Sequence, residues 1–266
     1  MTRIYLLIFF ITGSFKSFCQ ESTLPGDSLR KYSYTLLGFS NSSNADFGTC
    51  FFIKQNDNLF LVTAKHTLYN CDTVTKKEYS AFKYGIVFIP DPFKTIQFSV
   101  PQTIDTCFGI ERDTDLLVLK VDKSLFKNVN TVEKFILPPF RKLGDIEIFG
   151  QGMRTDSSFV SFDKQHHIYL PRNTFKIFTS IPILNNQYID SIHYILDLEK
   201  LRIGNWLKGF SGSPAFLQDD ETKKWRLCGV LVQGLIPDNK EHNDAILVVK
   251  PEYIFQSIKR FQWQEE

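Results

Sequence analysis

Short runs of apolar residues, many of them β-branched or aromatic, alternate along this chain with polar or proline-bearing turns. Runs of this length between such turns are typical of β-strands. Segments 47–53 and 59–63, joined by a polar turn at 56–58, predict a β-hairpin. Further strands are expected at 34–39, 85–89, 95–100, 115–121, 143–150, 225–234 and 245–249, with three or four more within 159–203. This density of strands and turns predicts an all-β barrel or sandwich.

The last apolar pattern of the chain has a helical period instead of an alternating one. Four apolar residues fall on one face of a helix that would begin after Pro251, namely Tyr253, Ile254, Ile258 and Phe261. Near the other end, residues 20–30 are polar and contain proline and glycine. We expect that segment to be loose.

The charge balance separates the classes of partner. The 266 residues include 31 Lys and Arg against 29 Asp and Glu, and residues 1–19 contain Arg3 and Lys16 but no acidic residue. Without residues 1–19 the balance is 29 to 29, so electrostatics gives no reason to expect nucleic acid or an anionic membrane as a partner.

Residues 1–19 have the pattern of a signal peptide. Arg3 precedes the apolar run 4–11, and Ser17-Phe18-Cys19 forms a small-x-small cleavage site before Gln20. The run is much shorter than the roughly 20 residues that a spanning helix needs. We therefore expect a secreted or periplasmic protein without a membrane span. The alternative is a lipid anchor through Cys19, which the bulky neighbouring Phe18 disfavours.

Beyond residue 19 the chain contains four cysteines, Cys50, Cys71, Cys107 and Cys228. An even number of cysteines in an exported protein allows disulfides. The spacing leaves open whether Cys107 and Cys228 are paired with each other or are buried thiols. The sequence contains no Cys-x-x-Cys motif and no grouped Cys/His ligands, so no zinc site is expected.

The segment 209–214 (GFSGSP) is the strongest indication of chemistry in the chain. Its glycines allow a sharp turn that exposes the hydroxyl of Ser211, beside which backbone N–H groups can converge as an oxyanion hole requires. A serine hydroxyl needs an adjacent base and a group that orients this base before it becomes a good nucleophile.

Two upstream segments contain suitable partners. His66 follows the apolar run of segment 61–66 (LVTAKH), and Asp115 precedes the apolar run of segment 115–121 (DLLVLKV). Asp113 is a rival for Asp115, which we prefer because the apolar run begins directly after it.

These three segments, in the order His, Asp, Ser, resemble the trypsin/chymotrypsin-like serine peptidases, particularly the bacterial branch. The first and third segments match the motifs of that family closely, and the second has Leu117 where alanine is frequent. The resemblance implies two six-stranded antiparallel β-barrels, at 20–135 with His66 and Asp115 and at 136–266 with Ser211 and the terminal helix.

The resemblance also implies a role for each residue. Ser211 would be the nucleophile, His66 the base and Asp115 the orienting carboxylate, and no metal or organic cofactor would be needed. The oxyanion hole would be the backbone N–H groups of Gly209 and Ser211. Substrate would be held by a pocket with Asn205 at its base and Val232 to Gly234 along its wall, and a disulfide would join Cys50 to Cys71.

One departure bears on activation. In family members that are activated by cleavage, an aspartate directly before the nucleophile pairs with the new N-terminal amine. Phe210 occupies that position here. The sequence therefore predicts activity without such a switch.

The resulting hypothesis is an exported, monomeric serine endopeptidase acting on protein or peptide substrates. A catalytically silent protein of the same fold that binds a partner is the alternative, although the complete set of His66, Asp115 and Ser211 argues against it. An α/β-hydrolase esterase is disfavoured, because its Gly-x-Ser-x-Gly elbow would need glycine at position 213, which is serine, and its base follows the nucleophile.

Overall fold

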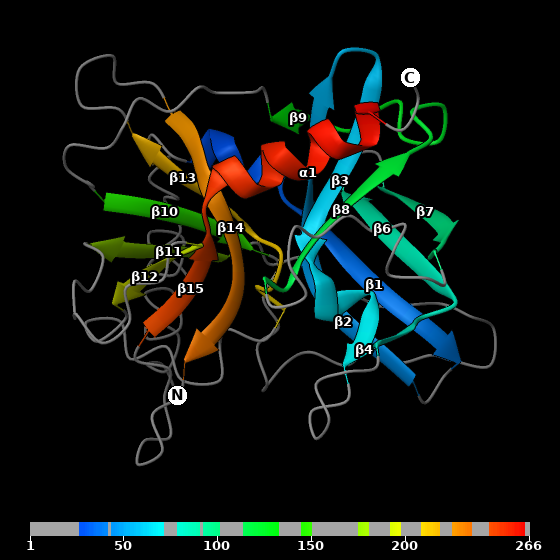
Figure 1. Cartoon of the computed structure of the whole chain (residues 1–266), viewed down its shortest axis with the longest axis horizontal. Coiled ribbons are helices and arrows are strands. Elements are labelled where there is room, and N and C mark those ends of the chain that lie inside the picture. Colours follow the sequence, from blue (N-terminus) through cyan, green and yellow to red (C-terminus); the bar gives the residue numbers. More distant parts are fainter. Residues whose placement is uncertain are drawn as a thin grey trace, which may run out of the picture.

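A computed structural model describes the protein at residues 27–41, 44–71, 79–90, 93–101, 114–132, 145–150, 175–180, 192–197, 209–218, 225–235 and 245–263. Within these residues the chain forms two large β-sheets, one small sheet, two 3-10 helices and one α-helix. Figure 1 shows the two large sheets side by side, with the helix α1 lying across both. The expected all-β class with a C-terminal helix is confirmed.

The first large sheet has the strand order β7-β6-β1-β2-β3-β8, and every pair along this path is antiparallel. A further strand, β9, pairs in parallel with β2. The strands are β1 (Tyr34–Asn41), β2 (Asn44–Gln55), β3 (Asn58–Ala64), β6 (Tyr84–Pro90), β7 (Phe93–Ser99), β8 (Leu116–Val121) and β9 (Thr131–Val132). The small sheet pairs β4 (Tyr69–Cys71) with β5 (Tyr79–Ala81).

The second large sheet has the order β11-β10-β13-β14-β15-β12, again antiparallel. Its outermost strands, β11 and β12, contact each other, so the sheet curls round on itself. Strand pairing among the described residues completes neither barrel, and the boundary predicted between residues 135 and 136 lies outside them. The strands are β10 (Asp145–Gly150), β11 (Phe175–Ser180), β12 (His193–Asp197), β13 (Pro214–Gln218), β14 (Trp225–Leu235) and β15 (Ala245–Val249).

The predicted hairpin is present as β2 and β3, which pair with Phe52 opposite Leu61 across a turn in which Asn56 has a φ of 53°. Asparagine tolerates this left-handed conformation, which explains the sharp reversal. The expectation of a loose segment at 20–30 was wrong for residues 27–30, and residues 20–26 lie outside the described residues. Residues Asp27–Tyr32 form the 3-10 helix η1, in which the apolar side chain of Leu29 is buried.

Strands β2, β3 and β8 bury both of their faces, which explains why they read as almost continuous apolar runs. One face packs inside the first sheet through residues such as Phe52, Leu61 and Leu117. The other face packs against the second sheet and includes Phe51, Val62 and Leu116. Alternate side chains of one strand therefore belong to two different cores.

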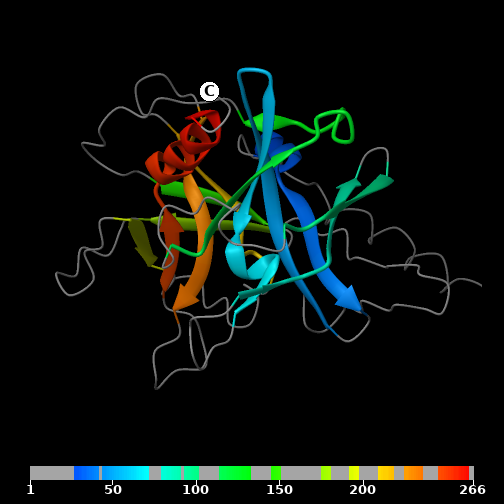
Figure 2. The same ribbon diagram turned by 45° about the vertical axis from the view of Figure 1, so that its right-hand side comes forward.

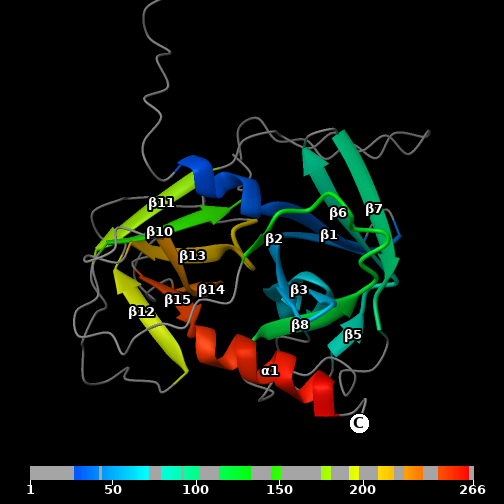
Figure 3. The ribbon, with the colours of Figure 1, turned by 90° about the horizontal axis from the view of Figure 1, so that it is seen from above.

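The second of these cores joins the two sheets and α1 (Pro251–Trp263). Phe216, Val230 and Val249 enter it from the second sheet, and Ile254 and Ile258 enter it from the helix, as the helical pattern predicted. Figure 2 shows β14 beside β3, which it contacts, and Figure 3 shows α1 along one edge of the junction. Among the described residues, no helix is long and apolar enough to cross a membrane.

The cysteines differ from the expected pairing. Cys50 is a free thiol with no exposed surface, so the structure does not contain the expected Cys50–Cys71 disulfide. Its side chain packs in the core of the first sheet, whereas Gly48 of β2 lies against Thr67 in the turn after His66. Cys228 is also a free, buried thiol, and Cys107 lies outside the described residues. Burial raises the pKa of the Cys50 thiol and brings that of Cys228 to about 12, so neither is a reactive thiolate at neutral pH.

The junction core should carry a large share of the stability. Ile258→Ala removes a side chain with no exposed surface and leaves a cavity between α1 and the sheets. We expect the free energy of unfolding to fall by about 2–5 kcal/mol, measured by urea denaturation. Leu125→Ala is the control, because that side chain is 46% exposed and its removal should cost less than about 0.5 kcal/mol. Equal losses in the two variants would contradict this account of the core.

Candidate active site

His66 lies in a tight turn at the end of β3. The 3-10 turn η2 (Lys65–Thr67) follows Ala64 directly and is closed by the N–H of Leu68, which donates to the carbonyl of Lys65 at 3.1 Å. Lys65 and Thr67 are buried, so the turn is anchored on both sides of the histidine. The side chain of His66 between them is 34% exposed.

The pairing of β3 with β8 places Asp115 beside this turn. Ala64 is opposite Leu116, and the next backbone hydrogen bond runs from the N–H of Lys65 to the carbonyl of Asp115 at 2.7 Å. Asp115 has a φ of 48°, an uncommon conformation that aspartate tolerates better than most residues. Its carboxylate accepts two hydrogen bonds from His66, from the backbone N–H at 3.0 Å and from the Nδ1 side of the ring at 2.6 Å.

This geometry concerns one of the two aspartates that the sequence offered as partners of His66. Asp115 contacts His66 through both carboxylate oxygens. Asp113 lies outside the described residues. The Asp115 contact fixes the ring of His66 with Nδ1 toward the carboxylate, which leaves Nε2 as the free nitrogen when the imidazole is neutral.

The environment of His66 makes its imidazole more basic. Burial lowers its pKa, but the hydrogen bond to Asp115, the charge of Asp115 and the charge of Asp46 together raise the pKa above its ordinary value. Asp46 belongs to β2 and acts through its charge alone, since the hydrogen bonds between described residues give it none to His66.

Ser211 lies in a turn whose glycines have the conformation that the sequence predicted. Gly209 and Gly212 both have a φ of 90°, which glycine adopts without steric cost. The N–H of Ser213 donates to the carbonyl of Phe210 at 2.9 Å, which closes the turn. The N–H of Gly212 donates to the carbonyl of Leu231 at 2.7 Å, and the N–H of Leu231 returns a bond to Ser213. The turn is therefore held against β14.

Strand β2 holds the same turn from the other side. The N–H of Thr49 donates to the carbonyl of Ser211 at 2.7 Å, and its hydroxyl donates to the carbonyl of Gly209 at 2.8 Å. A Cβ added to Gly48 would lie 2.5 Å from Thr67 Oγ1 and 2.7 Å from the carbonyl oxygen of Ser211. Since Thr67 is the neighbour of His66, the backbone of Ser211 and the His66 turn meet at this glycine.

Sequence patterns did not reveal Gly48 and Thr49, because both look like ordinary residues of a strand. Their importance comes from a contact between segments about 160 residues apart in the chain.

The backbone N–H groups of the Ser211 turn differ in their hydrogen bonding. Among the described residues, hydrogen bonds use the N–H groups of Gly212 and Ser213 but give no acceptor to those of Gly209 and Ser211.

Of the three residues predicted to bind substrate, the structure describes two, Val232 and Gly234. Asn205 lies outside the described residues. Val232 is only 1% exposed and packs in the junction core. Gly234 pairs with Ile246 of β15. Beyond Val230, β14 pairs with β15 on one side, and no described strand pairs with its other edge, which lies beside the Ser211 turn.

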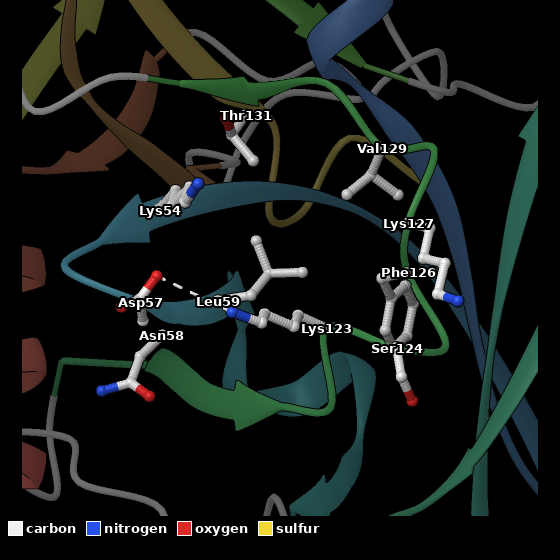
Figure 4. Close-up of a pocket in the computed structure, with 10 residues that line it drawn as sticks. All are labelled: Lys54, Asp57, Asn58, Leu59, Lys123, Ser124, Phe126, Lys127, Val129 and Thr131. Carbon is white, nitrogen blue, oxygen red and sulfur yellow. Dashed lines mark ion pairs between the residues drawn. The ribbon is translucent and has the colours of Figure 1, made fainter.

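A separate cavity of about 480 Å³ lies at the opposite end of β3, next to the β2–β3 turn. Figure 4 shows an apolar floor that includes Leu59 and Phe126, with Lys54, Lys123 and Lys127 around it. Lys123 approaches Asp57 at 3.7 Å, and both side chains are largely exposed. This cavity does not border His66, Asp115 or Ser211. The described residues contain no group of three or more His, Cys, Asp or Glu side chains suited to a metal ion.

Comparisons with known proteins find similarity in structure only. No protein-family model and no curated protein matches the sequence. Among solved structures, the chain is similar to GrC, with 13% identity and a TM-score of 0.53 over 88% of this chain and 95% of that one. It is also similar to the HtrA-type protease AlgW with tripeptide, with 13% identity and a TM-score of 0.50 over 86% of this chain and 60% of that one.

A third similar structure is the protease Anisep from Arthrobacter nicotinovorans, with 9% identity and a TM-score of 0.50 over 83% of this chain and 90% of that one. The chain spans about 60% of the length of the AlgW chain. Together these structures show that the protein has the fold of the trypsin/chymotrypsin-like serine proteases, as the resemblance of its motifs implied.

The contact between Asp115 and His66 can be tested without any substrate. Burial of the ring lowers the His66 pKa, whereas the hydrogen bond to Asp115 and the negative charge of Asp115 both raise it. Asp115→Asn removes the charge and weakens the hydrogen bond but leaves the ring buried. We expect the His66 pKa to fall below its wild-type value, measured by NMR titration of the imidazole. Asp122→Asn, at the other end of β8, should leave that pKa unchanged. A titration unaffected by Asp115→Asn would contradict the observed geometry.

Proposed function

We propose that the protein is an exported serine endopeptidase that hydrolyses peptide bonds through His66, Asp115 and Ser211. The observation that carries this proposal is the pair of hydrogen bonds from His66 to Asp115. These two residues lie at the ends of β3 and β8, and the neighbouring strand β2 is hydrogen-bonded to the Ser211 turn. The protease fold agrees with it.

In the proposed reaction, Ser211 Oγ attacks the carbonyl carbon of the scissile bond while Nε2 of His66 takes the hydroxyl proton. Asp115 holds Nδ1–H, which keeps Nε2 free to accept this proton, and it stabilises the imidazolium that forms. His66 then delivers the proton to the departing amine. Water hydrolyses the resulting acyl-enzyme by the same steps in reverse order, and no metal or organic cofactor takes part.

The oxyanion of the tetrahedral intermediate would be bound by the N–H groups of Gly209 and Ser211. These two groups lack an acceptor among the described residues and belong to a turn fixed by β2 and β14. One donor of this kind stabilises a transition state by about 2.7–4 kcal/mol. The open edge of β14 would bind the acyl side of the substrate as an added strand.

Phe210 supports activity without an activating cleavage. Its side chain is 1% exposed, where the cleavage-activated members of the family have an aspartate that pairs with a new N-terminus. A buried phenylalanine cannot make such an ion pair, so the turn is formed by apolar packing instead. The signal-peptide pattern of residues 1–19 supports an activity outside the cytoplasm as part of this proposal.

A fluorophosphonate probe tests whether Ser211 is a nucleophile. We expect the wild type to be labelled at Ser211, the Ser211→Ala variant to remain unlabelled, and a peptide library to be cleaved only by the wild type. Ser213→Ala is the matched control, because Ser213 Oγ is buried with no hydrogen-bond partner among the described residues, and its loss should leave labelling intact. Labelling should slow as the pH falls through the raised His66 pKa, because only the neutral imidazole accepts the proton.

A wild-type protein that is neither labelled nor able to cleave any peptide would exclude the enzyme. The silent partner-binding protein of the same fold would then be the remaining reading. If internal proteolysis were needed before labelling, the role assigned to Phe210 would be wrong while the nucleophile would stand.

Gly48 provides a second test, which probes the arrangement and not the reacting groups. Gly48→Ala places a methyl group against Thr67 and the carbonyl of Ser211, so we expect the rate of labelling at Ser211 to fall at least tenfold. Gly85→Ala is the control, because the atoms nearest to its methyl group belong to the ring of Phe98 and not to the active site. It should lower the unfolding midpoint without slowing the labelling of the folded protein. Equal labelling rates in the two variants would contradict the proposed contact.

A further inference from the structure

Asp46 lies on the face of β2 that meets the His66 turn. Residues two apart on a strand point to the same face, so Asp46 shares its face with Gly48, whose added Cβ would touch Thr67 and Ser211. Asp46 is also opposite Gly38 of β1, whose added Cβ would meet the carbonyl of Thr67. Directly opposed residues of an antiparallel pair point to the same side. Both neighbours therefore place Asp46 beside the turn that contains His66.

The carboxylate of Asp46 lies at an edge of β2 that no described strand covers. Residues 44–50 pair with β1 on one side, and pairing with β3 begins only at Cys50 on the other. On that second side the N–H of Thr49 binds the carbonyl of Ser211. The N–H of Phe47 points the same way as that of Thr49 and donates to Asp46 Oδ1 at 2.8 Å. The half-buried carboxylate of Asp46 is thus turned toward the edge that adjoins Ser211.

The position of this edge determines what part of a substrate would reach it. The Ser211 turn is bonded to β14 on one side and to β2 on the other. With the acyl side of a substrate on the open edge of β14, the residues beyond the scissile bond pass along β2. This step rests on the proposed function.

We infer that Asp46 is a specificity-determining residue that favours substrates with a lysine or arginine side chain in the first residues on the leaving-group side of the scissile bond. Its carboxylate already acts on His66 through its charge, so its field reaches the reacting groups. The other acidic group that faces His66, Asp115, is engaged in two hydrogen bonds with it, and Lys65 beside it is buried in the turn. Among these groups, Asp46 is the one placed at an open edge.

The expected discrimination is modest, because the carboxylate is half-buried and partly screened by water. An ion pair in such a position changes binding by roughly 2- to 5-fold, and less at high salt. An acidic leaving-group residue would be disfavoured by a similar factor, since like charges repel.

Two peptides that share their acyl side and differ only in the leaving-group residues test this inference. One has arginine and the other glutamate in the first two leaving-group positions, and kcat/KM is measured above the His66 pKa at low salt. We expect the wild type to prefer the arginine peptide, Asp46→Asn to reduce the preference by about 2- to 5-fold, and Asp46→Lys to reverse it. Asp57→Asn removes the same charge at the far end of β2, from a residue with a 96% exposed side chain, and should leave the preference unchanged.

A chromogenic substrate with no residues beyond the scissile bond separates the outcomes. A change in its rate of hydrolysis in Asp46→Asn reports the action of Asp46 on His66 or on the fold. That action cancels from the ratio of kcat/KM for the two peptides, so a change in this ratio reports specificity alone. Equal preference in the wild type and Asp46→Asn, or an equal shift in Asp57→Asn, would overturn the inference while leaving the peptidase in place. Absence of any cleavage, together with absence of probe labelling at Ser211, would overturn the proposed function and this inference with it.

Discussion

The apolar core between the two large sheets is the interaction on which the candidate active site depends. His66 and Asp115 belong to the first sheet, and the Ser211 turn enters the second at Pro214. Neither half contains the whole constellation, so it exists only where the sheets are docked. The docking surface is made of fully buried side chains from β2, β3 and β8 that pack against β13, β14, β15 and α1. Burial of each such side chain stabilises the folded state by about 1.5–3 kcal/mol, and the many side chains of this core together contribute far more than the few polar contacts at the site.

The polar contacts then fix positions that the apolar core only brings near one another. Ladder pairing of β3 with β8 continues one residue beyond the strand ends, and this sets Asp115 beside His66. Thr49 makes two hydrogen bonds to the Ser211 turn. These bonds are short and directional, so they restrict the turn to a narrow range of positions. Apolar packing thus supplies the free energy of docking, and the hydrogen bonds supply its register.

Local chemistry explains which features the sequence revealed. The β2–β3 hairpin and α1 follow from apolar periods of two and about 3.6 residues, and the Ser211 turn follows from its glycines and proline. The disulfide that the family resemblance implied is not present, because a motif does not tell which core a side chain enters. Cys50 points into the core of the first sheet. Gly48 and Thr49 escaped notice because their function arises only from contact with Ser211, a relation that no local pattern records.

The balance of effects at His66 links this architecture to chemistry. Burial alone would make the imidazole a weaker base, and it is the largest single effect on its pKa. The hydrogen bond and charge of Asp115 oppose it, and the charge of Asp46 adds to them, so that the net effect is a stronger base. Two carboxylates on different strands thus act on one ring, Asp115 by contact and Asp46 through space. Because β2 is also the strand that holds Ser211, a displacement of β2 would change both the position of the nucleophile and the basicity of the group that is proposed to activate it.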